Sequence, residues 1–285
     1  EYLPAKTGIN VRFVDISNLD EVKGAISEKT KVVYTESISN PTMVVADLPK
    51  LADMAHDAGA QLVVDNTFSP MLLSPAQQGA DIVVHSLTKF IGGCSDIIAG
   101  AVCASKEFIS QLMDLHMGSI MLLGPTMDPR VAFDLSLRLP HLGLRMREHS
   151  RRAQFFAEKL ESLGLDVSYP GLESHPQHAM LGKMLNAGFG HGGLFAIDLG
   201  DKDRAFAFMN DLQQTEGFGF LAVSLGYFDT LMSCSASSTS SELTDEELAE
   251  AGIKPGLVRV SLGYTGTLED RWAQFERALR RVGAI

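Results

Sequence analysis

Short apolar runs separated by amphipathic stretches fill the first half of the chain. Residues 31–36, 61–65 and 81–85 are rich in Val, Ile and Leu and are predicted strands, and residues 98–102 are a further candidate. Runs this apolar, joined by helices or long crossovers, are typical of a parallel sheet covered on both faces. We therefore expect an α/β fold with a mostly parallel central sheet and helices on both faces.

A helix is predicted between the first two runs, from about Asp47 to a stop at Gly59. Its apolar residues recur at the spacing i, i+3, i+4, i+7 and form one buried stripe of Leu48, Leu51, Ala52 and Ala55. From about residue 129 the pattern becomes helical, with an interruption at Pro140. We place a domain boundary there, which gives a large domain at residues 1–145 and a smaller α+β domain at residues 146–285.

The smaller domain is predicted to mix strands and helices. Residues 194–198, 220–224 and 257–261 are apolar enough for strands, and residues 203–212 for a helix. A last helix is predicted from Thr267, where Thr267 and Asp270 have the spacing of a capping box. The serine-rich stretch at residues 233–241 is predicted to be a mobile loop.

Composition narrows the possible functions. The net charge of -11 argues against a partner that is itself a polyanion, so we expect neither nucleic acid nor an anionic membrane. Three cysteines without close spacing, and no visible targeting segment, predict a reducing, cytoplasmic location. The chain opens with Glu1 instead of Met, so we expect that an upstream part is missing.

Polar residues follow the predicted strands at their carboxyl ends, where ligands bind in an open parallel sheet. Asn40 lies in the turn after the first strand, Asp65 ends the second, and Ser86, Thr88 and Lys89 follow the third. A lysine amine forms a Schiff base with an aldehyde cofactor, and pyridoxal phosphate also needs a carboxylate at its ring nitrogen and donors for its phosphate. This set meets those needs, although Asp65 alone is explained by a helix cap and Lys89 alone by a solvated surface charge.

The motifs around these residues resemble the Cys/Met-metabolism family of PLP-dependent enzymes, the trans-sulfuration enzymes. The resemblance rests on residues 36–41, 63–68, 86–89, 222–226 and 256–263, and it runs through essentially the whole chain in order. It implies the type I PLP-dependent transferase fold. Residues 122–127 and 175–178 and the serine-rich loop are most similar to the plant-type methionine γ-lyases of this family.

The resemblance assigns roles to individual residues. Lys89 would bind the aldehyde of pyridoxal 5'-phosphate and act as the catalytic base, and Asp65 would pair with the pyridine nitrogen. Ser86 and Thr88 would hold the phosphate, and Asn40 would lie near the phenolic oxygen. Arg259 would bind the substrate carboxylate, with Ser224 beside it. The guanidinium suits this role because it matches a carboxylate bidentately, and because Arg259 inside an apolar run is costly unless paired; the alternative is an edge strand with Arg259 facing water.

The implied activity is that of a carbon–sulfur lyase that releases methanethiol, 2-oxobutanoate and ammonia from methionine. Cystathionine γ-lyase, cystathionine γ-synthase and O-acylhomoserine sulfhydrylase share the same motifs and remain alternatives, as does a non-catalytic, truncated subunit. About the first third of the family pattern lies upstream of Glu1. The family also implies a homo-oligomer, a dimer of dimers with sites shared between subunits.

Two other patterns are similar to binding sites, one for a metal ion and one for a dinucleotide. His175 and His178 have a spacing that suits a metal on a helix, but Pro176 lies between them, so a loop without a metal is predicted. The glycine-rich residues 188–193 precede a strand instead of following one, which argues against a dinucleotide loop. We therefore expect no metal ion and no nicotinamide cofactor.

Overall fold

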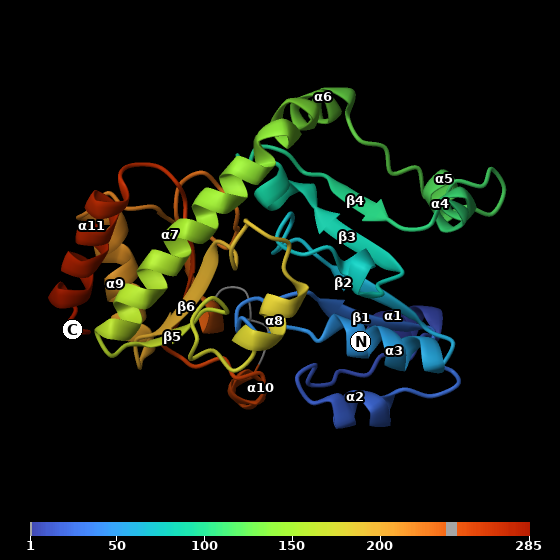
Figure 1. The fold of residues 1–285 in the computed structure, drawn as a ribbon, viewed down its shortest axis with the longest axis horizontal. Helices are drawn as coiled ribbons and strands as arrows, with labels where there is room; N and C mark the ends of the chain where they lie inside the picture. Colours follow the sequence, from blue (N-terminus) through green and yellow to red (C-terminus); the bar gives the residue numbers. More distant parts are fainter. Residues whose placement is uncertain (1, 238–243) are drawn as a thin grey trace.

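The computed structural model describes residues 2–237 and 244–285, and Figure 1 shows two sheets with the long helix α7 (Leu142–Ser162) running from one half to the other. In the first sheet the described strands have the order β1-β2-β3-β4. The first three pair in parallel and the fourth is antiparallel to the third. Their bounds are Val32–Glu36, Gln61–Asp65, Ile82–Ser86 and Gly100–Cys103. The predicted α/β fold with a mostly parallel sheet is confirmed.

Helix α3 (Leu48–Asp57) connects β1 with β2 and packs against both strands. The side chain of Asp47 caps its first turn by accepting a hydrogen bond from the N–H of Lys50. The predicted stripe of Leu48, Leu51, Ala52 and Ala55 is buried. Gly59 follows the helix with a φ of 67°, a backbone conformation that glycine adopts without strain. The predicted start, stop and buried face of this helix are therefore confirmed.

The second sheet has the strand order β5-β6-β9-β8-β7 among the described residues. The bounds in that order are Asp166–Ser168, Leu194–Asp198, Leu257–Ser261, Leu231–Cys234 and Phe220–Leu221. Helices α7, α9 (Lys202–Gln214) and α11 (Leu268–Arg281) pack against it around Phe156, Phe195, Phe208, Phe218 and Phe275. Thr267 caps α11 through the N–H of Asp270, as predicted.

Two predictions in this half were wrong in part. Only Phe220 and Leu221 of the predicted strand 220–224 are extended, because the carbonyls of Ala222 and Ser224 turn toward the guanidinium of Arg259. Ser233 was predicted to be in a mobile loop, yet it is buried in β8, opposite Arg259 of β9. Its small side chain fits against that large neighbour. Residues 238–241 of the predicted loop lie outside the described residues.

The two sheets belong to two hydrophobic cores. One surrounds α3 and the first sheet and also takes Met146, Leu181 and Leu194 from the second half of the chain. The other lies wholly beyond residue 150. The division into residues 1–145 and 146–285 stays a proposal, which this pair of cores supports, with α7 continuous across the boundary.

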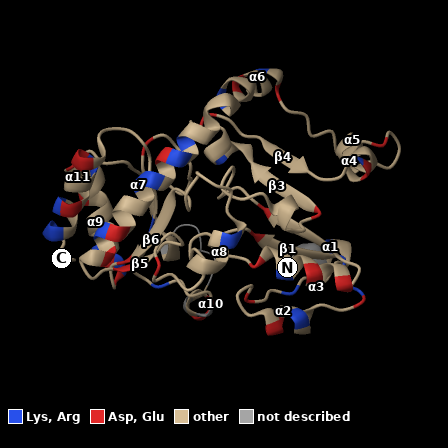
Figure 2. Cartoon of the chain, viewed as in Figure 1, with Lys and Arg blue, Asp and Glu red and all other residues tan. Residues whose placement is uncertain are grey.

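Figure 2 shows charges of both signs along α7, α9 and α11. The other described helices are short. None of the described helices is long and apolar enough to cross a membrane. The remaining helices are α1 Tyr2–Thr7, α2 Leu19–Ala25, α4 Lys106–Leu112, α5 Ser119–Leu123, α6 Pro129–Arg138, α8 His178–Met184 and α10 Asp245–Glu250. Single turns or short helices lie at Pro75–Gln78, Leu87–Ile91, Leu139–His141 and Ser235–Ser237. The turn at Leu139–His141 contains Pro140, so the predicted interruption is confirmed.

Candidate active site

The carboxyl ends of the three parallel strands lie side by side. Glu36, Asp65 and Ser86 are the last residues of β1, β2 and β3, and Glu36 stands directly opposite Asp65 in the register. A cavity of about 220 Å³ opens at this edge. Its wall consists of Glu36, Ile38, Asn40, Asp65, Thr67, Phe68, Ser86, Lys89 and Leu225. Four of the predicted residues, Asn40, Asp65, Ser86 and Lys89, therefore meet in one cavity, as the strand-end rule predicts.

Lys89 enters the cavity from the short π-helical segment Leu87–Ile91 that follows β3. Its ψ of -129° breaks the helical course of that segment and is part of the kink after the strand. The Nζ atom donates a hydrogen bond to the Oγ of Ser224 at 2.8 Å. Burial and the nearby charge of Arg259 lower the pKa of Lys89, since both disfavour the ammonium form. The alternative of a solvated surface lysine is wrong.

The backbone of Lys89 is packed tightly against the turn that carries Ser224. Gly226 has a φ of 76°, and a Cβ placed on it would lie 2.4 Å from the backbone nitrogen of Phe90. Glycine is required here both for the backbone conformation and for the close approach. The segment that carries Lys89 and the turn that carries Ser224 therefore pack closely against each other.

Arg259 lies in β9, between β6 and β8, and its side chain is 0% exposed. The alternative of an edge strand with Arg259 facing water is wrong. Nη1 donates to the Oδ1 of Asn40 at 3.2 Å, and Nη2 donates to the carbonyl of Ser224 at 2.7 Å. Nε has no hydrogen-bond partner, and no ion pair of Arg259 occurs among the described residues. Burial lowers its pKa to about 10. A buried guanidinium without a carboxylate partner is a candidate site for an anionic group of a ligand.

Asp65 is held in the cavity wall by its neighbours. Its Oδ1 accepts a hydrogen bond from the N–H of Thr67 at 2.9 Å, and the hydroxyl of Tyr34 donates to Oδ2 at 3.3 Å. Burial, followed by the charge of Asp65, raises the pKa of Tyr34 to about 12. No helix begins at Asp65, so the alternative of a helix cap is wrong. Its carboxylate is instead available to a cationic ligand group.

Glu36 was not predicted as part of the site. Its Oε2 accepts a hydrogen bond from the N–H of Asn40 at 2.9 Å, which fixes the start of the turn. Burial, with the nearby charge of Asp65, raises the pKa of Glu36, and the hydrogen bond to Asn40 opposes this. The signal was present, because Glu36 ends a predicted strand just as Asp65 does.

The two hydroxyl residues after β3 differ in their surroundings. Ser86 lines the cavity, and its N–H donates to the Oγ1 of Thr67 at 2.7 Å. Thr88 does not line the cavity, and its Oγ1 accepts a hydrogen bond from the N–H of Ala99 at 3.2 Å. Ser224 contacts both Lys89 and Arg259, as given above. Ser86 is therefore directly accessible to a ligand, whereas Thr88 is bonded to the segment that leads into β4.

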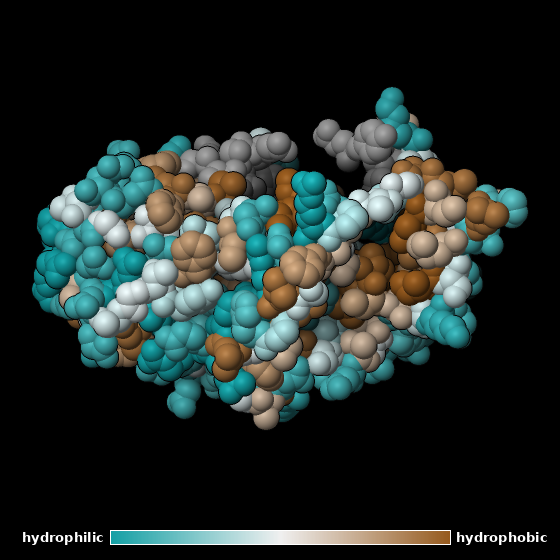
Figure 3. Space-filling model, turned by 90° about the horizontal axis from the view of Figure 1, so that it is seen from above, coloured by the Kyte–Doolittle hydropathy of each residue, from teal (hydrophilic) through white to brown (hydrophobic). Residues whose placement is uncertain are grey.

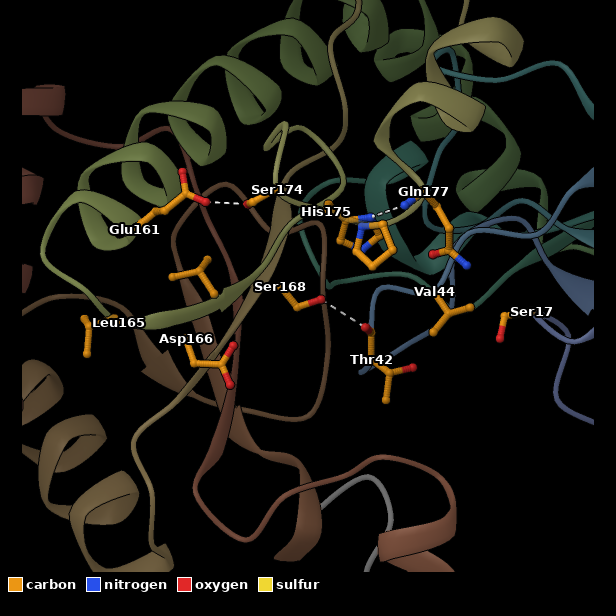
Figure 4. A pocket seen from close by; sticks show the side chains of 12 residues that line it. Ser17, Thr42, Val44, Glu161, Leu165, Asp166, Ser168, Ser174, His175 and Gln177 are labelled. Carbon is orange, nitrogen blue, oxygen red and sulfur yellow. Dashed lines mark hydrogen bonds between the residues drawn. The ribbon is translucent and has the colours of Figure 1, made fainter.

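A second hollow of about 630 Å³ lies over the junction of the two halves (Figure 4). It is lined by residues from the turn after β1, by β5 and by the segment that contains His175, Pro176 and Gln177. His175 lies in a loop, as predicted, whereas His178 begins α8. Within the described ranges, no three His, Cys, Asp or Glu side chains are arranged to hold a metal ion.

Comparison with known proteins agrees with this geometry. The family described as Cys/Met metabolism PLP-dependent enzyme matches residues 1–280. The chain is 57% identical over 282 residues to methionine gamma-lyase of Arabidopsis thaliana, covering 99% of this chain and 64% of that protein. It is 38% identical over 280 residues to cystathionine beta-lyase of Lactococcus lactis, covering 97% of this chain and 70% of that protein.

The fold is similar to solved structures as well. Cystathionine gamma synthase from Xanthomonas oryzae pv. oryzae superposes with a TM-score of 0.90 at 34% identity, covering 99% of this chain and 71% of that chain. The chain thus spans 64% of the length of the Arabidopsis protein and somewhat more of the others. Both the sequence motifs and the fold lead to the same assignment. The chain belongs to the Cys/Met metabolism family of PLP-dependent enzymes.

Proposed function

We propose that this chain forms the core of a carbon–sulfur lyase that converts L-methionine and water into methanethiol, 2-oxobutanoate and ammonia. The observation that carries the proposal is the half-buried amine of Lys89, which lies in one cavity with Asp65 and next to the buried guanidinium of Arg259. The 57% identity to an enzyme with the name methionine gamma-lyase supports the choice of substrate.

The residues of the cavity fit pyridoxal phosphate chemically. Lys89 supplies the amine for its aldehyde, and Asp65 supplies a carboxylate for its protonated ring nitrogen. Ser86 would hold the phosphate through its hydroxyl, which lines the cavity, and Asn40 would lie near the phenolic oxygen. Thr88 lies outside the cavity wall, so its hydroxyl would reach the phosphate only from beside Ser86. Burial raises the pKa of Glu36, which makes this acid a poor partner for a cationic ring. We therefore assign the ring nitrogen to Asp65, the other strand-end acid in the cavity wall.

When bound, the cofactor supplies an electron-withdrawing ring that stabilises negative charge at the substrate Cα. Lys89 Nζ would accept the proton from that carbon, and its lowered pKa favours the free amine that this requires. Ser224 holds Nζ at 2.8 Å and so limits where the amine can reach. Arg259 would bind the substrate carboxylate and thereby fix the orientation of the Cα–H bond.

Other members of the family remain as alternative activities. Cystathionine γ-lyase, cystathionine γ-synthase and O-acylhomoserine sulfhydrylase need the same lysine, acid and arginine. The similarity to cystathionine beta-lyase of Lactococcus and to cystathionine gamma synthase of Xanthomonas supports cystathionine as an alternative substrate or product. A non-catalytic subunit is the alternative from another class.

Turnover assays separate these proposals. The holoenzyme is offered methionine, cystathionine and O-acetylhomoserine side by side, and release of 2-oxobutanoate and thiol is measured. We expect the highest kcat/KM for methionine, and a loss of about a thousandfold in Lys89→Ala. Equal turnover by Lys89→Ala, or no turnover of any substrate by the wild-type protein, would contradict an enzyme of this kind.

We further propose a cytoplasmic homo-oligomer, a dimer of dimers with sites shared between subunits. The free thiols of Cys94 and Cys103 support a reducing location. Figure 3 shows hydrophobic side chains gathered on the side where α4 and α5 lie in Figure 1. Helix α5 buries none of its residues, and Leu122 and Leu123 are 65% and 82% exposed. Exposed apolar side chains this close together favour a protein partner.

A further inference from the structure

Residues 39–45 form a strained loop between β1 and α3, and this loop carries Asn40 into the cavity. Met43 in its middle is fully buried and has a φ of 62°, a left-handed conformation that is rare for a residue other than glycine. Such a conformation persists only where the surroundings impose it.

Some of the contacts lie within the loop. The hydroxyls of Ser39 and Thr42 are 2.7 Å apart and hydrogen-bonded, and the N–H of Val44 donates to the Oγ of Ser39 at 2.9 Å. These bonds shape the turn, but they do not fix it relative to the second half of the molecule, where Arg259 lies.

Two hydrogen bonds from the second half hold the outer side of the loop, and Figure 4 shows the first of them, between Ser168 and Thr42. The hydroxyl of Ser168, at the end of β5, donates to the carbonyl of Thr42 at 3.1 Å. The Oε1 of Gln177 accepts from the N–H of Val45 at 3.0 Å, and the Nδ1 of His175 accepts from the N–H of Gln177 at 3.2 Å and so supports Gln177 in turn. These residues are more than 120 positions from the loop in sequence, since the two measured bonds span 126 and 132 residues.

On its inner side the loop presents Asn40 to the guanidinium of Arg259. The Oδ1 of Asn40 is the one side-chain acceptor of that guanidinium among the described residues, and its other bonds go to the carbonyls of Ala222 and Ser224. Movement of the loop would therefore move a direct support of Arg259. Lys89, by contrast, is held by Ser224 and has no hydrogen bond to the loop.

We propose that Ser168, His175 and Gln177 are positioning residues that clamp the loop 39–45 so that Asn40 keeps Arg259 oriented for the carboxylate of an amino-acid substrate. This inference rests on the proposed role of Arg259, but it does not depend on which thiol leaves. It also gives the motif at residues 175–178 a function other than metal binding. Loosening the clamp weakens substrate binding more than proton transfer, because Lys89 is anchored elsewhere.

Two pairs of variants test the clamp. Ser168→Ala removes the hydroxyl that holds Thr42, and Ser174→Ala is the matched control, because Ser174 lines the same hollow but its hydroxyl donates to Glu161. Gln177→Met removes the acceptor for Val45, and Gln177→Glu restores an acceptor. In the holoenzyme we expect Ser168→Ala and Gln177→Met to raise KM about three- to tenfold, the effect of one lost hydrogen bond, with kcat within about twofold. Ser174→Ala and Gln177→Glu should keep the wild-type KM.

A second readout does not need activity. Hydrogen–deuterium exchange of residues 39–45 in the cofactor-free protein should be faster in Ser168→Ala and Gln177→Met than in the wild type and in Ser174→Ala. Unchanged exchange in the clamp variants would overturn the proposal, and so would a fall in kcat without a rise in KM. If the wild-type protein turned over no amino acid, the proposed function would fail, while the exchange result would still decide whether the clamp holds the loop.

Discussion

The Nζ of Lys89 and the Oγ of Ser224 are 2.8 Å apart although 135 residues separate them in sequence. The carbonyl of the same serine accepts a hydrogen bond from Arg259 at 2.7 Å. One residue thus ties the amine proposed for proton transfer to the guanidinium proposed for carboxylate binding. The charge of Arg259 disfavours the ammonium form of Lys89, which suits an amine that has to accept a proton.

Arg259→Lys should weaken substrate binding while leaving a positive charge in place. A lysine cannot bind the carboxylate bidentately and cannot reach Asn40 and Ser224 together. We expect KM for the amino-acid substrate to rise about 10- to 100-fold, which is the effect of losing a charge-assisted hydrogen bond. Steady-state kinetics measure this.

The matched control for that variant is Arg152→Lys. Arg152 is similarly buried, but it donates to the carbonyls of Thr265 and Gly266, away from the cavity. The substitution Arg152→Lys should lower the free energy of unfolding and leave the KM for the amino-acid substrate unchanged. An equal rise in KM in both variants would argue against carboxylate binding by Arg259.

Gly226→Ala should displace the backbone that carries Lys89. Its Cβ would lie 2.4 Å from Phe90 N, in addition to the cost of the positive φ. We expect the free energy of unfolding to fall by about 3 kcal/mol, and cofactor binding to weaken. Gly59→Ala has a similar φ of 67° but no atom within 4 Å, so it should cost only about 1 kcal/mol and leave the site intact. Urea unfolding of both variants tests the difference.

The amine of Lys89 should lose its proton more readily than an ordinary lysine in the cofactor-free protein. Burial and Arg259 lower its pKa, so the free amine should appear at a pH below the usual midpoint of about 10.4. Arg259→Met removes one of the two causes and should move the midpoint upward. The rate at which acetic anhydride labels Lys89, followed by mass spectrometry against pH, gives the midpoint. A midpoint that stays or falls in Arg259→Met would refute the electrostatic coupling.

The exposed apolar residues of α5 should be needed for assembly. Leu123→Glu places a charge in the proposed subunit interface, so we expect a smaller particle by light scattering at micromolar concentration. Leu163→Glu is the control, because Leu163 follows the last residue of α7 and is 39% exposed. Figure 1 shows this end of α7 far from α5. An unchanged mass for Leu123→Glu would show that α5 is not in the interface.

Much of the site follows from local sequence patterns. Asp65 and Lys89 could be placed together because they follow apolar strands, and parallel strands end at one edge of the sheet. Glu36 ends β1 and obeys the same rule, so it could have been predicted in the same way. The burial of Arg259 was expected because β9 is apolar on both sides of it.

Long-range contacts could not be predicted in this way. Nothing in residues 39–45 or 168–177 indicates that Ser168 and Gln177 contact the Asn40 loop, since the contact depends on how the two halves pack. At Ser233 the local sequence pattern predicted the wrong structure. Serine clusters are typical of loops, yet Ser233 is buried in β8 opposite Arg259, where a small side chain fits.

The central claim is that Lys89 is the residue that binds pyridoxal phosphate. The most direct test is reduction of the purified holoenzyme with borohydride, followed by proteolysis and mass spectrometry of every lysine-containing peptide. We predict a phosphopyridoxyl group on Lys89 alone, and none on the Lys89→Ala protein. A stable label on another lysine, with Lys89 unmodified, would contradict the account.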